Sequence, residues 1–273
     1  DRVVAIHINH QLQTAAADFE AHCARTCRAL AVPLEVRRVT VACGPRQSLE
    51  AQARAIRYDT LAAVAKQVNA EVVLLAQHAQ DQLETVLIAL SRGAGLPGLS
   101  GMAPRFERGG VTFLRPILSV QGPQIRAWLD LFSHPYVDDP SNQNTQFTRN
   151  RIRHTVLPAL EGALPGIATA VARTAQHAAQ AQVLLDELAA ADAVTVGVPP
   201  RIKDLQGLSE PRQANLLRWW LSGIPLATPS AAQLAELMGQ VAACTTRGHH
   251  IAIKVGTGAV VRDRDVLGFV NTP

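Results

Sequence analysis

Short apolar segments separated by helical patterns place the strongest constraint on the fold of this chain. Residues 2–9 (RVVAIHIN), 34–41 and 71–76 (EVVLLA) are short, rich in β-branched residues and followed by polar residues, so we predict strands there. Residues 15–31 and 48–68 carry apolar side chains at helical spacing, with Ser48 as the N-cap of the second helix. Alternating strands and helices with continuously apolar strands are typical of a parallel sheet covered on both faces, so we predict an α/β fold.

The rest of the chain divides by composition. We predict a helix over 81–91, a glycine-rich loop over 93–102, a short strand over 111–114 and a helix over 123–131. Residues 135–147 are polar and rich in turn formers, which indicates a linker. Helical patterns dominate 149–160, 167–191, 210–221 and 230–239, and 250–270 has two or three strand patterns. We therefore predict an α/β core at 1–135, a linker and connecting helix at 136–165, and a helical domain with a small C-terminal β element at 166–273.

Composition narrows the class of protein without identifying it. The net charge of +4 is compatible with an anionic partner such as RNA, although many enzymes are equally basic. None of the four cysteines forms a C-x-x-C pair, which argues against a disulfide framework and fits a reducing compartment. No run reaches the ~18 apolar residues of a membrane span, so we expect no membrane partner.

Polar residues follow two of the predicted strands, where ligands bind in doubly wound sheets. The first group is His7, Asn9 and His10. The second group is His78, Asp81 and Glu84. Carboxylates at this edge suit Mg²⁺ or a cationic amine. The alternatives are a solvated helix face for the two acids and a capping or core histidine for His78.

Helical spacing assigns the two faces of the predicted helix at 81–91. Asp81, Glu84 and Thr85 share one face, because they are three and four residues apart. The opposite face is apolar and is predicted to pack on the sheet; it consists of Leu83, Val86, Leu87 and Leu90.

Two further segments have the composition of anion-binding sites. Arg92 is followed by glycines at 93, 95, 98 and 101, and exposed N–H groups in such a loop bind anions. The alternative is a plain flexible connection. Residues 149–153 (RNRIR) hold three arginines suited to phosphate contacts. The alternative is a solvated helix start that pairs with Asp138, Asp139 or Glu161.

Five segments in order resemble the tRNA(Ile)-lysidine synthase family: HINHQLQ, SLEAQARAIRY, LAQHAQDQLETVLIALSRGAGLPGLSGM, LRPIL and VDDPSNQNTQFTRNRIRHTVLPAL. The resemblance is strong over residues 3–160 and looser beyond. It implies a Rossmann-like nucleotide-binding domain of the PP-loop ATPase type, followed by a mostly helical domain. It also implies a cytoplasmic enzyme that uses ATP and Mg²⁺; a homodimer is left open.

The resemblance implies a ligation on RNA. The wobble cytidine of tRNA(Ile) with a CAU anticodon is adenylated at its C2 oxygen, and the ε-amine of free L-lysine then displaces AMP. The product, lysidine, changes the codon specificity from AUG to AUA.

The family's site residues carry over position by position. The implied catalytic residues are Asp81, Glu84 and His78, with Asp81 and Glu84 binding lysine or Mg²⁺. The implied nucleotide-binding residues are His7, Asn9, His10, Arg54, Arg57, Arg92, Gly93 and Gly95. The implied RNA-binding residues are Arg115, Asn142, Arg149, Asn150, Arg151 and Arg153.

The sequence departs from the family pattern in three places. One is its end at Pro273, since longer members carry a further C-terminal domain that helps to hold the tRNA; we expect either a short-form enzyme or a chain without that domain. The S-G-G-x-D-S loop expected upstream of His7 is absent from the 273 residues, so we expect a truncated chain that neither binds ATP well nor turns over. Gln80 stands where many members have an Asp, which weakens a two-Asp metal site. The alternative functions are a noncatalytic tRNA-binding remnant and another PP-loop tRNA modification enzyme, such as a cytidine thiolase. The isolated cysteines argue against the thiolase.

Overall fold

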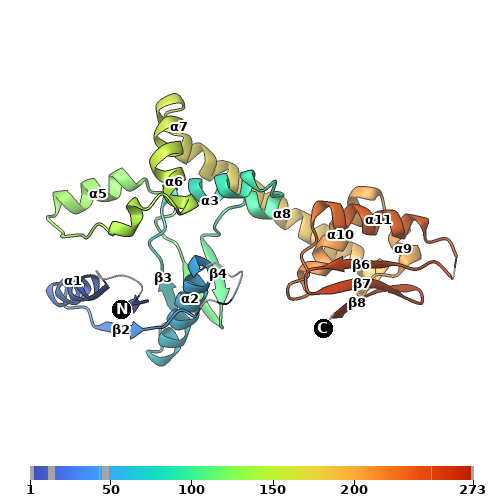
Figure 1. Cartoon of the computed structure of the whole chain (residues 1–273), viewed down its shortest axis with the longest axis horizontal. Helices are drawn as coiled ribbons and strands as arrows, with labels where there is room; N and C mark the ends of the chain where they lie inside the picture. The colour runs from blue at the N-terminus through green and yellow to red at the C-terminus, as the bar shows by residue number, and fades with distance from the viewer. Residues whose placement is uncertain (1–2, 12–15, 43, 45–48, 247, 272–273) are drawn as a thin grey trace. The chain divides into compact units, whose positions relative to one another are not determined.

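A computed structural model describes residues 3–11, 16–42, 44, 49–246 and 248–271. The chain forms two compact units, Asp1–His177 and Ala178–Pro273, which are considered separately below (Figure 1). The boundary between them falls within one helix, whereas the predicted second domain begins at residue 166; the predicted boundaries remain a prediction. The predicted N-cap, Ser48, lies outside the described residues.

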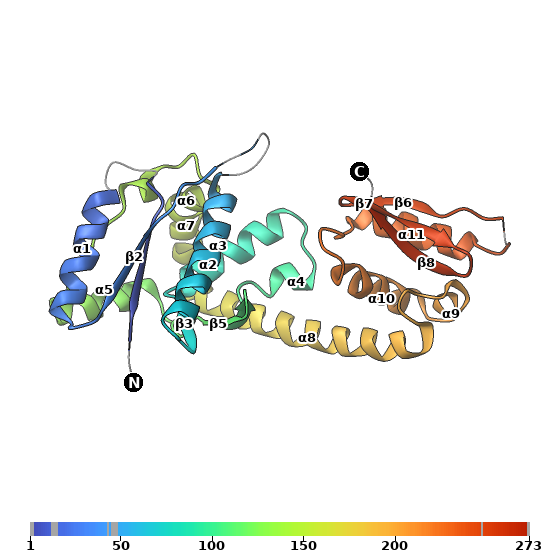
Figure 2. The ribbon, with the colours of Figure 1, turned by 90° about the horizontal axis from the view of Figure 1, so that it is seen from below.

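Unit 1 begins with a parallel strand pair. β1 (Ala5–Asn9) pairs with β2 (Leu34–Arg38), and α1 (Ala16–Ala29) forms the crossover between them. α1 and α2 (Leu49–Gln67) lie on opposite sides of this pair (Figure 2). The prediction of parallel strands with helices on both faces is therefore confirmed for β1 and β2.

A second, mixed sheet follows. β3 (Val72–Leu74) pairs in parallel with β5 (Val111–Leu114), and β5 pairs antiparallel with β4 (Arg105–Arg108). β4 was not predicted, because its sequence RFER carries three charged residues. Val73 is buried, but Val72 and Leu74 are 40% and 63% exposed. The prediction that both sheet faces are covered is therefore wrong for β3 among the described residues, since its second face has no packing partner there.

α2 supplies the main core of unit 1. Tyr58, Leu61, Ala62 and Ala65 recur at helical spacing and pack with Val73, Phe113 and the partly buried Ile6 and Ile8. Burial of apolar surface on this one face fixes the helix against strands of both sheets. The N-terminal part of α2, and the side of this helix that faces away from the core, remain available to line a site.

α3 (Ala79–Ser91) departs from its predicted packing. Leu83 and the partly buried Leu87 contact Leu157 and Ala168, so this apolar face packs on helices and not on the sheet. The sequence pattern defines an apolar face but not the element that covers it. The glycine-rich loop also differs from prediction, because it contains the short helix α4 (Leu96–Leu99) with Pro97 in its first turn.

The segment after β5 is mostly helical. It comprises α5 (Gly122–Leu131), the 3₁₀ helix η1 (Pro140–Gln143), α6 (Thr148–Arg151), the π-helix η2 (Ile152–Val156), α7 (Leu157–Ala163) and α8 (Ile167–Val196). α6, η2 and α7 run on without a break. π-Helical turns are rare and are frequent at functional sites, which draws attention to residues 149–153.

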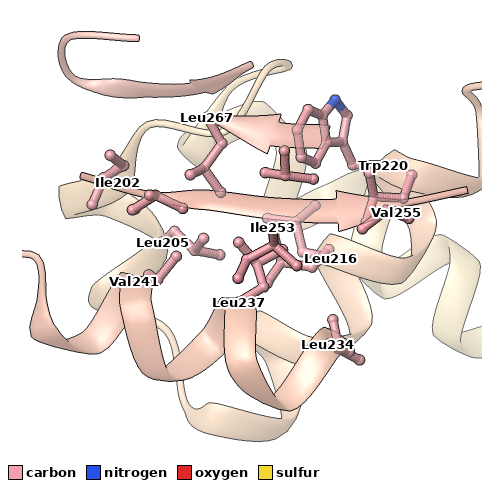
Figure 3. Close-up of a cluster of buried hydrophobic side chains, with 14 of the residues drawn as sticks. Ile202, Leu205, Leu216, Trp220, Leu234, Leu237, Val241, Ile253, Val255 and Leu267 are labelled. Carbon is pink, nitrogen blue, oxygen red and sulfur yellow. The ribbon is translucent and has the colours of Figure 1, made fainter. Parts of the chain in front are cut away.

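Unit 2 has helices packed on a small sheet. It comprises α9 (Ile202–Gln206), α10 (Glu210–Ser222), α11 (Ala231–Ala243), β6 (Ala252–Val255), β7 (Gly258–Asp263) and β8 (Val266–Asn271). The strands form an antiparallel sheet in sequence order. Leu205, Leu216, Leu237, Ile253 and Leu267 interdigitate in its core (Figure 3). The predicted helices at 210–221 and 230–239 and the terminal strands are confirmed; α9 was not predicted.

Among the described residues, no single helix has the length and apolar composition needed to cross a membrane. The bent pair Thr148–Ala163 and Ile167–Val196 meets that test only when its two helices, 96° apart, are taken together.

Candidate functional site

A pocket of about 640 Å³ opens in unit 1 beside the N-terminal half of α2. Its walls come from α2, the start of α3 and the segment 141–153. The pocket brings together nine of the predicted site residues: His10, Arg54, Arg57, Asp81, Glu84, Asn142, Arg149, Asn150 and Arg153.

A buried acidic pair forms one side of the pocket. Glu84 is 0% exposed, and its Oε1 accepts a hydrogen bond of 2.7 Å from Arg153 Nε. Arg153 Nη2 also donates to Asp81 Oδ1 at 3.2 Å. Glu84 Oε2 has no hydrogen-bond partner among the described residues and lies 3.6 Å from Arg149 Nη1. The interpretation of Asp81 and Glu84 as a solvated helix face is therefore wrong.

The electrostatics of Glu84 follow from this position. Burial raises the pKa of the Glu84 carboxyl, because water no longer stabilises its charge. The guanidinium of Arg153 lowers the pKa of Glu84, and the negative charge of Asp81 raises it. Glu84 is therefore a carboxylate with a raised pKa and one oxygen, Oε2, that accepts no hydrogen bond among the described residues.

Local structure holds the two arginines in place. Arg149 and Arg153 are four residues apart on the α6–η2 turn, so their side chains share a face. Asn150 donates from Nδ2 to Ser141 O at 2.8 Å and to Asn144 O at 2.9 Å, which fastens the preceding loop to the helix. Arg149 also donates to Thr85 Oγ1 at 3.3 Å.

The acidic pair does not fit Mg²⁺ in this arrangement. Both carboxylates accept from Arg153, so a dication there would have to displace a guanidinium or lie against it. Within the described residues, no group of three or more His, Cys, Asp or Glu could hold a metal ion. The site suits a single positive charge better than a metal, and the predicted metal role of Asp81 and Glu84 is not favoured.

His78 lies at the start of α3. It is the N-cap residue, and its backbone N–H donates to Asp81 Oδ2 at 3.0 Å. Its Nε2 is 3.6 Å from the same oxygen. The capping interpretation is confirmed; through this contact His78 positions Asp81, and a catalytic role remains a prediction.

The other side of the pocket is basic. Arg54 and Arg57 lie one turn apart on α2, with their guanidinium carbons 5.5 and 5.7 Å from the centroid of the Tyr58 ring. Burial lowers the pKa of Arg57, and the charges of Arg54 and Arg149 act in the same direction. His10 faces this region, and its pKa is lowered by burial and by Arg57.

His7 and Asn9 lie outside the larger pocket. Together with His10 they line a smaller cavity of about 190 Å³. Asn9 Nδ2 donates to Glu20 Oε2 at 3.0 Å, and His7 Nδ1 lies 3.5 Å from Cys23 Sγ. His10, which directly follows β1, is the only one of these three residues that lines both pockets.

Besides His78, five predicted residues line neither cavity. Arg115 is 7% exposed and donates to Gln77 Oε1, the Ala103 carbonyl and the Tyr58 hydroxyl. This buried network supports the core, and the RNA-binding role of Arg115 remains a prediction. The others are Arg92, the C-cap of α3; Gly93, with φ +65°; Gly95, the N-cap of α4; and Arg151, which donates to the carbonyls of Thr145 and Gln146.

Tyr58 and Glu50 belong to the site but were not predicted. Tyr58 lies beneath Arg54 and Arg57, and Glu50 Oε1 is 3.6 Å from Arg149 Nε. The signal for Tyr58 was the spacing R-x-x-R-Y, which puts an aromatic ring within one helical turn of two cations. Glu50 gave no signal, because its partner is distant in sequence.

The chain matches two family models. Residues 1–160 match the PP-loop domain, and residues 201–267 match the TilS substrate binding domain. The chain is 52% identical over 261 residues to tRNA(Ile)-lysidine synthase of Polaromonas naphthalenivorans, covering 96% of this chain and 79% of that protein. It is 42% identical over 248 residues to the synthase of Burkholderia pseudomallei, covering 89% of this chain but about half, 51%, of the relative.

A solved structure shares the fold. It is the U34-tRNA thiolase NcsA from Methanococcus maripaludis with its [4Fe-4S] cluster, with a TM-score of 0.53 and 13% sequence identity. The match covers 64% of this chain and 61% of the thiolase. At this identity the likeness supports the predicted PP-loop fold alone.

Proposed function

Since this chain belongs to the tRNA(Ile)-lysidine synthase family, we propose that it carries the site for ATP-dependent transfer of L-lysine to C2 of a wobble cytidine. The substrate is the minor tRNA(Ile) with a CAU anticodon. ATP supplies the adenylyl group that makes the C2 oxygen a leaving group. The ε-amine of lysine then displaces AMP, and the resulting lysidine reads AUA in place of AUG.

The uncommitted oxygen of Glu84 is the observation that carries this proposal. A fully buried carboxylate oxygen without a hydrogen-bond donor is costly, and it is retained where a ligand supplies the donor. A lysine ε-ammonium has three donors on one positive charge. It would satisfy Glu84 Oε2 and leave the bonds from Arg153 to Oε1 and to Asp81 in place.

The same environment helps the amine to become a nucleophile. An ammonium must lose its proton before it can attack, and a carboxylate is normally too weak a base to take it. Burial raises the pKa of Glu84 and also disfavours the charged amine, so the two proton affinities approach each other. Glu84 is therefore proposed as the proton acceptor and Asp81 as the residue that helps to orient the amine.

The basic residues are proposed to hold the anionic substrates. Asn142, Arg149, Asn150 and Arg153 line the pocket and would position the anticodon loop. Residues 201–267 of unit 2 match the TilS substrate binding domain and are proposed to contact another part of the tRNA. ATP, lysine and tRNA meet in the cytoplasm, where we place the reaction. The homodimer remains a prediction.

Labelled lysine incorporation into tRNA tests the proposal. The assay uses the protein with an S-G-G-x-D-S loop supplied, because the 273 residues contain none. We expect incorporation that requires ATP and cytidine at the wobble position. Glu84→Gln keeps the size of the side chain but removes the proton acceptor, so we expect a rate loss of about 100-fold or more.

The exposed carboxylate of Glu71 gives the matched control. Glu71→Gln removes the same charge outside the pocket and should leave incorporation unchanged. Equal rates in Glu84→Gln and Glu71→Gln would refute the role of Glu84. Incorporation that did not depend on ATP, or that proceeded on a tRNA with uridine at the wobble position, would refute the reaction itself.

A further inference from the structure

The segment at the end of the glycine-rich loop is fastened to α3 by one buried side chain. Gln82 is 4% exposed and stands between Asp81 and Glu84 in the sequence of α3. Its Nε2 donates to the Met102 carbonyl at 3.2 Å, and its Oε1 accepts from the Met102 N–H at 2.8 Å. A side-chain amide has both a donor and an acceptor, so Gln82 satisfies both backbone groups of Met102, as a neighbouring strand would.

Gly101 makes room for this Gln82–Met102 pair. Its φ is +61°, in the left-handed region, and a Cβ added to it would lie 2.8 Å from the Cδ, Nε2 and Oε1 atoms of Gln82. A side chain at this position would therefore push the amide away from Met102, in addition to the conformational cost of a positive φ. The close contact thus requires glycine at position 101.

Arg115 holds the same segment on its other side. Its guanidinium donates to the carbonyl of Ala103, and its backbone N–H donates to the carbonyl of Pro104 at 2.8 Å. The same guanidinium donates to Gln77 Oε1 at 3.1 Å, and Gln77 lines the pocket. Residues 102–104 are therefore held between two buried polar side chains, one of which belongs to α3.

Met102 brings this segment to the pocket. It is 8% exposed and lines the same pocket as Asp81 and Glu84. A lysine carries its ammonium on a flexible four-carbon stem, which needs an apolar wall at a fixed distance from the carboxylates if the amine is to be held in one place. Met102 supplies apolar surface there, and its backbone is hydrogen-bonded to the α3 turn that bears both acids.

We propose that Gln82 is a positioning residue for the amine substrate. It holds Met102 at a set distance from Asp81 and Glu84, and Met102 in turn selects the length of the amine stem. Gln82 is not among the residues that line the pocket, so it acts through Met102. The inference rests on the proposed function, because it names what fits the same site to L-lysine. L-Ornithine, one methylene shorter, would reach the carboxylates or the Met102 wall but not both.

Transfer of two amines measures this selectivity. The assay is that described above, with the S-G-G-x-D-S loop supplied, and it compares kcat/KM for L-lysine and L-ornithine in the parent protein and in Gln82→Met. Methionine has nearly the shape of glutamine but cannot make the two hydrogen bonds. We expect the KM for lysine to rise about 10-fold and the preference for lysine over ornithine to fall about 10-fold, since one methylene is worth about 10- to 200-fold in a fitted pocket. The KM for ATP should stay unchanged.

The matched control is Gln176→Met, at an exposed position of α8, which should change none of these values. A fall in kcat that is equal for both amines, with each KM unchanged, would overturn the proposal. That result is expected when a substitution only reduces the folded fraction of the enzyme.

A double-variant cycle tests whether Gln82 acts through Met102. Met102→Ala removes the apolar wall itself and should lower the preference for lysine by about as much as Gln82→Met does. If both substitutions act on the same wall, the double variant should lose little more than either single variant. Losses that multiply would mean that the two residues act independently, and the proposal would fall.

Gly101→Ala disturbs the Gln82–Met102 pair from the loop side and serves as the second variant if Gln82→Met folds poorly. Its control is Gly166→Ala, because Gly166 also has a positive φ, +81°, but an added Cβ would meet nothing within 4 Å. Only Gly101→Ala should lower the preference for lysine. Absence of lysine transfer in the parent protein would refute the proposed function. Transfer with the parent's selectivity in both Gln82→Met and Gly101→Ala would refute the role of Gln82 alone.

Discussion

The two fully buried carboxylates among the described residues, Glu84 in unit 1 and Asp192 in unit 2, are satisfied in different ways. Both oxygens of Asp192 accept hydrogen bonds from one residue, Arg212, in a bidentate pair. Glu84 shares Arg153 with Asp81 and lies 3.6 Å from Arg149 Nη1, and its Oε2 has no hydrogen-bond donor among the described residues. A carboxylate with both oxygens hydrogen-bonded to one arginine has no oxygen left for a ligand, whereas Glu84 still has one. The difference separates a structural carboxylate from one available for chemistry.

The interiors of the two units follow the same division. Five of the six buried polar or charged side chains among the described residues belong to unit 1: Asn9, Gln82, Glu84, Arg115 and Asn150. Unit 2 buries one large apolar cluster, while unit 1 has two smaller ones. Buried polar groups in unit 1 thus support a site at some cost in stability, whereas the interior of unit 2 is mainly apolar and stabilises its fold.

Truncation of the unit 2 core should have the largest effect on stability. Leu237→Ala removes a fully buried side chain from the core of Figure 3 and should lower the free energy of unfolding by about 3 kcal/mol. Urea unfolding followed by tryptophan fluorescence measures it, because Trp220 is part of the same cluster. Leu184→Ala is the control, since this side chain is 66% exposed and should cost under about 0.5 kcal/mol. Equal losses of unfolding free energy in the two variants would contradict the conclusion that the buried apolar cluster stabilises unit 2.

Removal of Arg153 tests whether the buried Glu84 carboxylate depends on this arginine for its stability. Arg153→Leu strands Glu84 without its only hydrogen-bond donor and should lower the free energy of unfolding by about 2 kcal/mol, reduced by the partial exposure of Arg153. The double variant Arg153→Leu with Glu84→Leu should recover most of that loss, because no buried charge remains. If the double variant is as unstable as Arg153→Leu alone, packing and not charge explains the loss.

The third difference between Glu84 and Asp192 concerns the pH dependence of stability, and its effect should be smaller than those of the two substitutions above. Burial raises the pKa of Glu84 in the folded state above its unfolded value, so the folded protein binds this proton more tightly. That contribution is fully present below the unfolded pKa and is lost as the pH rises through the folded pKa. Glu84→Gln cannot titrate, so the midpoint difference between it and the parent chain should change with pH across this range. Thermal scans from pH 4 to pH 8 measure it; parallel curves would contradict the raised pKa.

Some of the site was readable in the sequence for a local reason. Asp81, Glu84 and Thr85 were placed on one helix face by their spacing, and the structure puts all three beside Arg149 or Arg153. Arg54 and Arg57 were assigned to the cleft and line it. Gly93 and Gly95 were also assigned to the nucleotide site, and the structure places them at the end of α3 and the start of α4, away from the pocket. Spacing on a helix carries three-dimensional information, and glycine content does not.

Burial was the property that sequence could not supply. Asp81 and Glu84 have the same charge and differ by three positions, yet only Glu84 is fully buried with an orphaned oxygen. Arg115 and Arg153 were both predicted to bind RNA. In the structure Arg153 lines the pocket, whereas Arg115 is buried in the core against Phe106 and Tyr58. Neither outcome follows from local pattern, because each depends on a segment far away in the chain.

By itself the sequence determined most of the strands and helices and their order, the parallel β1–β2 unit, the faces of α3 and the family, since these depend on local periodicity and on ordered motifs. The tertiary structure alone decided which elements cover the apolar face of α3, which arginines pair with Glu84 and which of its oxygens has no hydrogen-bond donor. The physical reason is that charge pairing and desolvation are set by distances between residues remote in sequence. The chemistry of this pocket therefore arises where a helix from residues 79–91 meets arginines some 70 positions later.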